Sequence, residues 1–208
     1  MEPQFQKINE FLLKEHSCLE PNDYCYFIGD DAARQGFNHS EMNHVIHNFK
    51  KPVERKDLPE WRHKEQATVK IAHWIISLPT FNKLKKATWI PIPPSKAKND
   101  PQHDDRLWRV LLKMKEMEKD LDIRELLLIK VSREAAHNPG ITRPKTQDHF
   151  NNLMINQAQQ NPSPQAIVLF DDIITSGANF KAAQKMIKHE FPEVPTVGLF
   201  VARNVQIE

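Results

Sequence analysis

Apolar residues recur along the chain with two different periods, and these periods predict both helices and strands. In residues 4–18 the apolar positions, among them Ile8 and Leu12, follow the spacing of one helix face. Elsewhere, short apolar runs lie between polar, Gly or Pro residues, as in buried strands. The patterns predict helices over residues 4–18, about 40–50, 63–78, 104–119 and 179–190 with a short helix from Phe150, and strands over residues 24–28, 88–92, 126–131, 167–170 and 196–202.

The order of these elements predicts the fold class. Strands alternate with helices along most of the chain, which is typical of an α/β fold with a doubly wound, mainly parallel sheet and flanking helices. Polar segments over residues 29–38 and 132–148 and a Gln/Asn/Pro-rich stretch over residues 157–165 connect the elements. A length of 208 residues suits one such domain.

Composition narrows the classes of function. The 29 basic and 27 acidic side chains give a net charge of +2, so binding of nucleic acid needs a local patch, such as residues 83–86 with 96–98. Cys18 and Cys25 are too few for a four-cysteine zinc site or a disulfide framework. The first residues lack the apolar core of a signal peptide, and no stretch reaches the length of a membrane span. We therefore expect a cytoplasmic protein without membrane contact.

Residues 167–180 combine features that favour a site for a phosphorylated sugar. An apolar run predicts a buried parallel strand, and Asp171 and Asp172 follow at its carboxyl end, where α/β sheets bind ligands. Two adjacent carboxylates repel each other unless hydroxyl groups or a metal-bearing ligand compensate them. The turn that follows, residues 175–179, offers hydroxyls, a glycine and backbone N–H groups at a helix start, which suits a phosphate. The alternative is a pair of solvated acids followed by an ordinary helix cap.

Residues 89–100 place an apolar strand directly before a proline-rich turn. This turn presents the side chains of Ser95, Lys96 and Lys98. Cationic and N–H donors of this kind stabilise the charge that develops on a pyrophosphate leaving group. The alternative is an ordinary strand exit with exposed lysines.

Two further polar segments carry charged side chains. Asp104, Asp105 and Arg106 lie at the beginning of a predicted helix, where acids favour the helix dipole and an arginine can clamp a phosphate. Residues 132–148 have the composition of a lid that closes over a polyanion. The candidate lid residues are Arg133, His137, Arg143 and Lys145. A solvated loop explains the same residues equally well.

The stretch 167–180 resembles the 5-phosphoribosyl 1-pyrophosphate (PRPP) loop of the type I phosphoribosyltransferases (PRTases). It shares the apolar run, the two acids, two further apolar residues and the turn of hydroxyl, Gly and small residues. The resemblance implies a type I PRTase fold in which the catalytic pair Asp171 and Asp172 holds the ribose hydroxyls. It assigns the 5′-phosphate to Thr175, Ser176, Gly177, Ala178 and Asn179, and the pyrophosphate to Ser95, Lys96 and Lys98. Asn179 stands where Thr or Ser is common, and its amide still donates to a phosphate oxygen.

The order of elements over residues 23–203 also resembles the competence-protein-F (ComF-like) branch of that family. The shared motifs are PIPPSK at residues 91–96 and RPKTQDHFNN at residues 143–152. The chain departs from the branch in two ways: it has no amino-terminal four-cysteine zinc module, and NDPQHDDRL replaces RGFNQ-like residues after the pyrophosphate strand. The comparison implies an N-terminal helix at residues 1–22 and a PRTase-like domain at residues 23–208, with a small hood at about residues 23–62.

The resemblance implies a transferase that uses PRPP and Mg²⁺, with the ion held beside Asp171 and Asp172 through PRPP itself. Ribose 5-phosphate would pass to a nitrogenous base or related nucleophile, with release of pyrophosphate. Thr175 replaces the acid that is common in purine-salvage relatives, which disfavours an oxopurine acceptor. Candidate acceptor contacts in the hood are Tyr24, Tyr26, Phe37, His39, His44 and His47.

The same fold also suits proteins without turnover, because a fold does not determine a function. The alternative hypothesis is a non-catalytic PRPP- or nucleotide-binding regulator or complex component. Nucleic-acid binding is a third hypothesis, which the near-neutral net charge weakens. We further expect a homo-oligomer.

Overall fold

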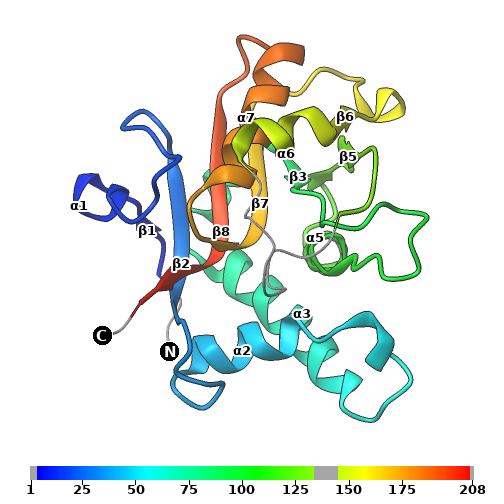
Figure 1. The fold of residues 1–208 in the computed structure, drawn as a ribbon. Helices are drawn as coiled ribbons and strands as arrows, with labels where there is room; N and C mark the ends of the chain where they lie inside the picture. Colours follow the sequence, from blue (N-terminus) through cyan, green and yellow to red (C-terminus); the bar gives the residue numbers. More distant parts are fainter. Residues whose placement is uncertain (1–3, 134–144, 207–208) are drawn as a thin grey trace.

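Six strands form the central sheet of the computed structural model, which describes residues 4–133 and 145–206 (Figure 1). Their order across the sheet is β1 (Gln6–Lys7), β2 (Cys25–Ala32), β8 (Thr196–Val205), β7 (Ile167–Ile174), β3 (Thr88–Pro91) and β4 (Asp122–Ile123). The neighbouring strands β2, β8, β7, β3 and β4 all run parallel, whereas β1 pairs antiparallel with β2 at one edge. The predicted α/β class with a mainly parallel sheet and flanking helices is therefore confirmed.

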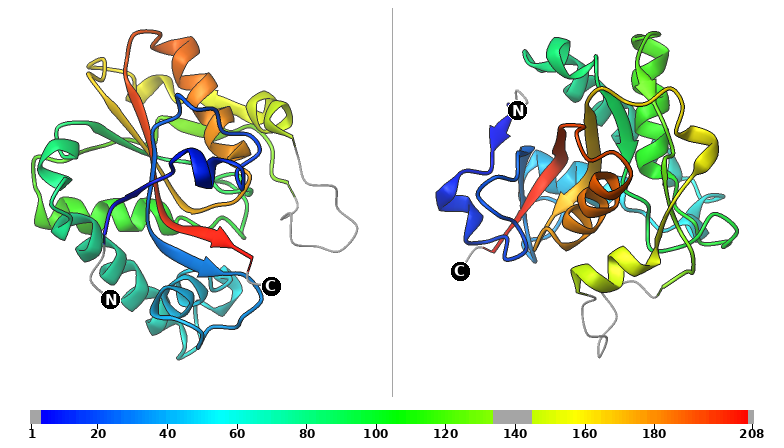
Figure 2. Two further views of the ribbon diagram at one scale, coloured as in Figure 1. Left: turned by 90° about the vertical axis from the view of Figure 1, so that its left-hand side faces the viewer. Right: turned by 90° about the horizontal axis from the view of Figure 1, so that it is seen from above.

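Successive side chains of the central strands point to opposite faces of the sheet. Because the side chains on both faces are apolar, helices cover both faces. In β7, Val168 and Phe170 point to one face and Ile167 and Leu169 to the other, and all four are buried. The first face packs against helices α2 (Glu41–Phe49), α3 (Trp61–Ser77), α4 (Phe81–Leu84) and α5 (Arg106–Met117). The second face packs against α7 (Ala178–Glu190), which lies on the opposite side of the strands in the view from above (Figure 2).

A two-stranded hairpin lies beside the central sheet and corrects one prediction. β5 (Leu127–Ile129) pairs antiparallel with β6 (Leu153–Ile155), so the strand predicted over residues 126–131 does not join the parallel sheet. The short strand β4 takes that place at the sheet edge. Arg124 follows β4 directly, and its N–H still donates to the carbonyl of Trp89 at 2.9 Å. Its guanidinium binds Asp122 (2.9 Å) and carbonyl groups of the 159–162 segment. The chain then leaves the sheet and forms the hairpin.

The N-terminal segment is helical over one turn only. β1 pairs with β2, and α1 covers Glu10–Leu13, so the helix predicted over residues 4–18 is wrong. The side chain of Asn9 caps α1 by accepting hydrogen bonds from the N–H groups of Phe11 and Leu12, both at 3.1 Å. Phe11 is 83% exposed, although its spacing placed it on the apolar face. Pairing of the preceding residues with β2 outweighed the helical pattern.

The other helices agree with the sequence pattern, whereas several boundaries differ. α2, α3, α5 and α7 occupy the predicted positions within a few residues, and α6 (Thr146–Asn152) begins before the predicted start at Phe150. β2 continues to Ala32, so the polar loop predicted over residues 29–38 begins later. Short 3₁₀ turns lie at η1 (Val53–Arg55) and η2 (Gln157–Gln159). In the described ranges no helix combines the length and apolar character needed to cross a bilayer.

Trp89 of β3 provides a test of the core on the α3 and α5 side. It is fully buried, lies 6.2 Å from the ring of Phe81 and 6.4 Å from that of Phe170, and donates to the carbonyl of Leu84. We expect Trp89→Ala to lower the free energy of unfolding by roughly 3–5 kcal/mol, because a cavity remains. The control Phe11→Ala removes an exposed ring and should stay within about 0.5 kcal/mol. Urea unfolding measures both, and equal losses would contradict this packing.

Candidate functional site

A cavity of about 850 Å³ opens at the carboxyl ends of the parallel strands. Open α/β sheets bind their ligands at this edge, because the connecting loops and helix N-termini gather there. The cavity brings together segments that follow β7, β3, β2 and β8 with the start of α5. Its walls include residues 91–99, 102–108, 127–130 and 171–180 with Asp31, Lys50, Arg133 and Asn204.

The acid pair lies on the last part of β7, at the floor of this cavity. Asp171 and Asp172 are only 8% and 6% exposed, because β8 and β3 flank the strand. Asp171 accepts a hydrogen bond from the N–H of Asp172 (2.8 Å), and Asp172 accepts one from Ile173 (2.7 Å). The second carboxylate oxygen of Asp172 binds the guanidinium of Arg106 at 3.0 Å and 2.6 Å. The two acids therefore have different partners.

Because their partners differ, the pKa values of the two carboxyl groups are shifted in opposite directions. Burial, and then the neighbouring charge of Asp172, raise the pKa of Asp171 well above its ordinary value. Burial acts in the same direction on Asp172, but Arg106 and Lys50 overcome it and hold the pKa of Asp172 well below its ordinary value. At neutral pH Asp172 is ionised, and Asp171 has a strongly increased tendency to keep its proton. The two carboxyl groups of the cavity floor thus differ in their affinity for a proton.

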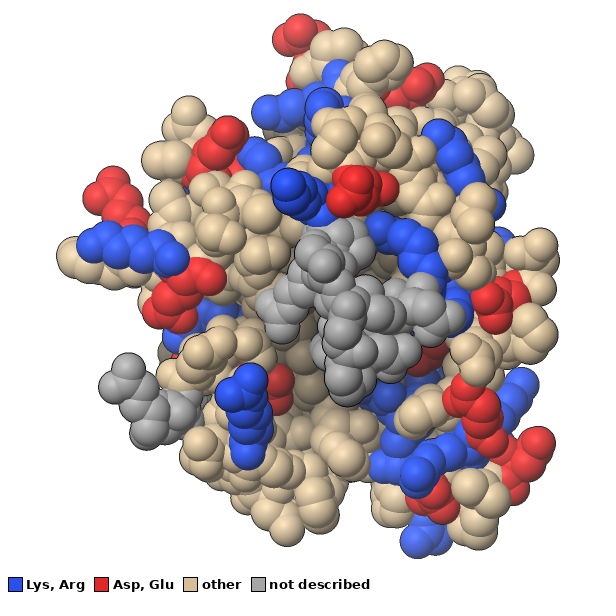
Figure 3. All heavy atoms as spheres, in the orientation of Figure 1, with Lys and Arg blue, Asp and Glu red and all other residues tan. Residues whose placement is uncertain are grey.

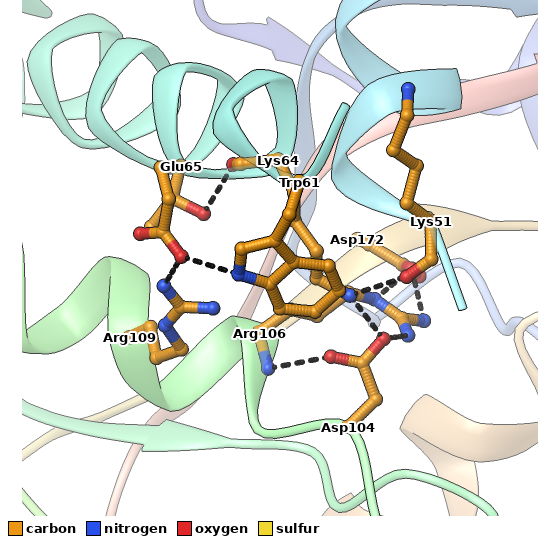
Figure 4. A network of polar contacts seen from close by, with 9 residues as sticks. Lys51, Trp61, Lys64, Glu65, Asp104, Arg106, Arg109 and Asp172 are labelled. Carbon is orange, nitrogen blue, oxygen red and sulfur yellow. Dashed lines mark hydrogen bonds and ion pairs between the residues drawn. The ribbon is translucent and has the colours of Figure 1, made fainter. Parts of the chain in front are cut away.

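A chain of alternating charges continues from Asp172 into the protein (Figure 4). Arg106, at the start of α5, also donates to Asp104 (2.8 Å), and Lys64 of α3 donates to the same Asp104 oxygen at 2.7 Å. The side chain of Lys64 is completely buried, donates to the carbonyl of Lys51 (2.7 Å) and lies 4.9 Å from the ring of Trp61. Arg106, which the sequence offered as a phosphate clamp, is thus bound to two acids of the protein.

The turn after β7 supplies backbone groups to the cavity wall. Residues 175–179 all line the cavity, and Gly177, the N-cap residue of α7, has a φ of +85°. A Cβ atom at this position would also lie 2.7 Å from Cδ2 of Leu19, so glycine is required by both conformation and space. Gly177 has no side chain to cap α7, and the hydroxyl of Ser176 accepts a long hydrogen bond, 3.4 Å, from the N–H of Ala178. This hydroxyl engages one N–H group of the helix N-terminus, whose partial positive charge favours an anion.

The loop after β3 lines the cavity beside the acid pair. Ser95, Lys96 and Lys98 all lie on its wall, as the sequence prediction requires for one shared site. Lys98 forms an ion pair with Glu125. The loop is fixed by its neighbours, since the carbonyl of Ser95 accepts from the N–H of Arg133 at 2.8 Å. Its cationic side chains thus lie on the β3 side of Asp171 and Asp172.

The four candidate lid residues have different positions. Arg133 lines the cavity, and among the described residues its buried Nε and Nη1 atoms have no hydrogen-bond partner. Burial lowers the pKa of Arg133, although its charge persists. Lys145 lies before α6, where its N–H donates to Asp148, and it is not part of the cavity wall. His137 and Arg143 lie outside the described residues.

The cavity residues on the β2 and β8 side of the acid pair were not predicted from the sequence. Asp31 at the end of β2 is paired in register with Asn204 at the end of β8, and both line the cavity with Lys50. Burial raises the pKa of Asp31, against the opposing charge of Lys50. A signal was present, because residues 25–31 repeat the order of an apolar run followed by two acids that marks β7.

The aromatic and histidine side chains that were expected to bind an acceptor do not line this cavity. Phe37 instead lies against His44 and His47, with ring centroids 5.9 Å and 5.3 Å apart. Tyr26 stacks on Phe5 at 5.4 Å. The side chains of this expected set, none of which belongs to the cavity wall as described, are Tyr24, Tyr26, Phe37, His39, His44 and His47. From the range predicted as the hood, about residues 23–62, the cavity wall includes Asp31, Lys50 and residues 52–54.

The protein groups near the acid pair do not form a metal cage of their own. Within residues 4–133 and 145–206, no three His, Cys, Asp or Glu side chains are grouped in a way that holds an ion. One oxygen of Asp172 is already engaged by Arg106. A divalent cation at this site would therefore take most of its oxygen ligands from a bound substrate and from water.

The surface charge on the face seen in Figure 1 is mixed. Figure 3 shows Lys and Arg side chains on this face with Asp and Glu side chains among them. A nucleic-acid surface is recognised by a patch or stripe of one sign. The mixed pattern gives the nucleic-acid hypothesis no additional support.

Comparison of the sequence with protein-family models and with curated proteins found no match. The comparisons thus assign no family to the chain. Function has to follow from the geometry of the cavity.

The buried lysine of the charge network provides a test of its importance. We expect Lys64→Met to lower the free energy of unfolding by roughly 2–3 kcal/mol, because the carbonyl of Lys51 loses its donor and Asp104 keeps only Arg106 as a cationic partner. The control Lys113→Met breaks a pair of nearly equal length, 2.8 Å to Glu116, whose side chains are 41% and 61% exposed. That loss should not exceed about 1 kcal/mol. Urea unfolding of both variants measures the difference, and a small, equal loss in both would contradict the network.

Proposed function

We propose that the protein is a phosphoribosyltransferase of the type I fold, which binds PRPP with Mg²⁺ and transfers ribose 5-phosphate to a nitrogen nucleophile. The observation that carries the proposal is the arrangement of one cavity. The paired acids Asp171 and Asp172 lie between the helix N-terminus after β7 and a lysine-bearing loop after β3. PRPP has a matching order of groups: a phosphate, a ribose with two free hydroxyls and a pyrophosphate.

The 5′-phosphate fits the turn after β7. Within the described part of the chain, the N–H groups of Ser176 and Gly177 have no protein acceptor, and both residues line the cavity. The N-terminus of α7 adds its partial positive charge at the same place. The side-chain amide of Asn179 is a further donor on the same wall. A phosphate monoester needs this combination of donors.

The ribose fits the two carboxyl groups at the end of β7. Carboxylate oxygens accept hydrogen bonds from hydroxyl groups, and both acids line the cavity. Each side chain accepts a hydrogen bond from a main-chain N–H group, and Arg106 also binds Asp172, before any ligand arrives. The acid pair therefore orients the sugar with little reorganisation of the protein.

The pyrophosphate fits the β3 side of the cavity. Lys96 and Lys98 bring positive charge to this wall, and the buried guanidinium of Arg133 adds donors that lack protein partners among the described residues. When the bond from the anomeric carbon to the pyrophosphate oxygen breaks, its electron pair stays on that oxygen. Nearby cations and donors stabilise the developing charge. Bound Mg²⁺ supplies further neutralisation of that charge.

The acceptor fits the opposite side, where β2 and β8 end. The nitrogen lone pair forms the new bond to the anomeric carbon, and the nitrogen then loses a proton. Asp31, whose pKa is raised by burial, is a carboxyl group on that side of the cavity wall that suits a proton acceptor. Lys50 and Asn204 add one cation and one amide for recognition of the acceptor.

A binding protein without turnover is the second candidate, and one observation favours it. Arg106 occupies an oxygen of Asp172 with two of its nitrogens, so a ligand has to share this carboxylate with the protein. A regulator that senses PRPP or a nucleotide tolerates such sharing. Release of pyrophosphate in the presence of a panel of nitrogen nucleophiles distinguishes the two candidates. The cytoplasmic location and the homo-oligomer expected from the sequence stay predictions.

The acid pair provides the first test of the proposal. We expect Asp171→Asn combined with Asp172→Asn to abolish the heat of PRPP binding in titration calorimetry, because both sugar-binding carboxylates are lost. Asp172→Asn also leaves Arg106 without one partner, which lowers stability. A second variant, which adds Arg106→Gln to these two substitutions, removes that unpaired charge while Asp104 keeps its pair with Lys64. Unchanged PRPP binding in the folded variants would refute the assignment.

Lys96 provides a test of the pyrophosphate side. We expect Lys96→Ala to weaken the binding of pyrophosphate by about tenfold and that of ribose 5-phosphate much less, because a charge-assisted contact to one anion is lost. Competition against labelled PRPP measures both affinities. Lys113→Ala, on the exposed surface of α5, should change neither. Equal losses for the two ligands would show that the loop after β3 does not hold the pyrophosphate.

A further inference from the structure

Residues 16–19, here named the strap, run behind the turn that follows β7. The strap contacts three successive residues of the turn in order. A ring nitrogen of His16, Nδ1, bonds the carbonyl of Thr175, and the N–H of Cys18 donates to the carbonyl of Ser176 at 2.9 Å. Leu19 lies against Gly177, as the close approach of its Cδ2 atom to a built Cβ position indicates. These contacts lie behind the turn, and no strap residue belongs to the cavity wall as described.

The hydrogen-bond partner of His16 determines which of its two ring nitrogens carries the proton. A carbonyl oxygen only accepts, so Nδ1 must carry the hydrogen and donate it to Thr175. His16 is 1% exposed, and Nε2 is buried with no hydrogen-bond partner among the described residues. Burial lowers the pKa of the ring, so His16 is a neutral donor at pH 7.

The two bonds from the strap determine where the turn points its own donors. In a planar trans peptide, the C=O and the N–H of the following residue point in opposite directions. The carbonyls of Thr175 and Ser176 point back to the strap, so the N–H groups of Ser176 and Gly177 point away from it. Both residues line the cavity. In the described structure neither N–H has a protein acceptor.

The strap is itself fixed at both ends. Glu15, just before it, pairs with Arg203 of β8 at 2.8 Å. Asp23, just after it, pairs with Lys181 of α7 at 2.9 Å, and its carboxylate also accepts from the N–H of Glu20. The strap is thus anchored to the strand and the helix on either side of the turn that it contacts.

We infer that His16 is a positioning residue of the phosphate-binding turn, which aims the N–H groups of that turn into the cavity by holding the carbonyl of Thr175 from behind. The inference rests on the proposed function, because it assigns the 5′-phosphate to this turn. It adds a segment remote in sequence from the turn to the machinery that binds the ligand.

The other anion-binding loop has a comparable histidine, which provides a matched control. Nδ1 of His103 bonds the carbonyl of Lys96 at 2.8 Å, so each loop is held by one histidine ring through one carbonyl. His103 also lines the cavity, whereas His16 does not. A histidine that acts through its own loop should affect only the ligand of that loop.

The experiment measures the affinities of ribose 5-phosphate and of pyrophosphate for the full chain and three variants. His16→Leu keeps the bulk of the ring and removes the donor, and it should weaken ribose 5-phosphate by roughly ten- to hundredfold with little change for pyrophosphate. His16→Asn restores an N–H donor at nearly the same place and should recover most of that loss. His103→Leu should show the reverse selectivity. Thermal unfolding of each variant checks that the fold persists.

The outcomes separate this inference from the proposed function. If the unmodified protein binds both ligands and His16→Leu loses neither, or loses both equally, the positioning role is overturned. A failure of His16→Asn to recover binding, despite a folded protein, would also overturn it. If the unmodified protein binds neither ligand, the proposed function fails, and the inference fails with it.

Discussion

The burial of two adjacent carboxyl groups at the end of β7 is the constraint on which the rest of the site depends. An unpaired buried charge is costly, so one acid tends to stay neutral and the other needs a cation. Arg106 supplies that cation and also binds Asp104, which in turn binds the buried cation of Lys64. The network joins β7 to α5 and α3, so the first helical layer is tied to the floor of the cavity.

The remaining donors are arranged around this floor by contacts from outside the cavity. The turn after β7 is held by the strap, and the loop after β3 is held by Arg133, Ser132 and His103. The shapes of both segments are therefore fixed by contacts within the protein. These fixed donors on two sides of a carboxylate floor are the basis on which we propose, as the ligand, a sugar with a phosphate at one end and a pyrophosphate at the other.

Local sequence predicted the parts of the site that are contiguous in the chain. The strand, acid pair, turn and helix over residues 167–190 follow directly from an apolar run, two acids and a Gly-containing turn. The sequence did not predict that Arg106 binds Asp172, that β5 pairs with β6 or that His16 contacts Thr175, because each contact joins segments distant in the chain. Asp31 was missed for a different reason: its segment was interpreted as a loop, although β2 continues through it.

Titration calorimetry of the unmodified protein with PRPP, with and without Mg²⁺, tests the central claim most directly. The account predicts saturable binding at one site per chain that depends on Mg²⁺. Ribose 5-phosphate and pyrophosphate should each compete, because each occupies one end of the same cavity. Absence of binding at millimolar PRPP by the folded protein, or binding that neither fragment displaces, would contradict the assignment of the two anion-binding segments and the acid pair to one PRPP site.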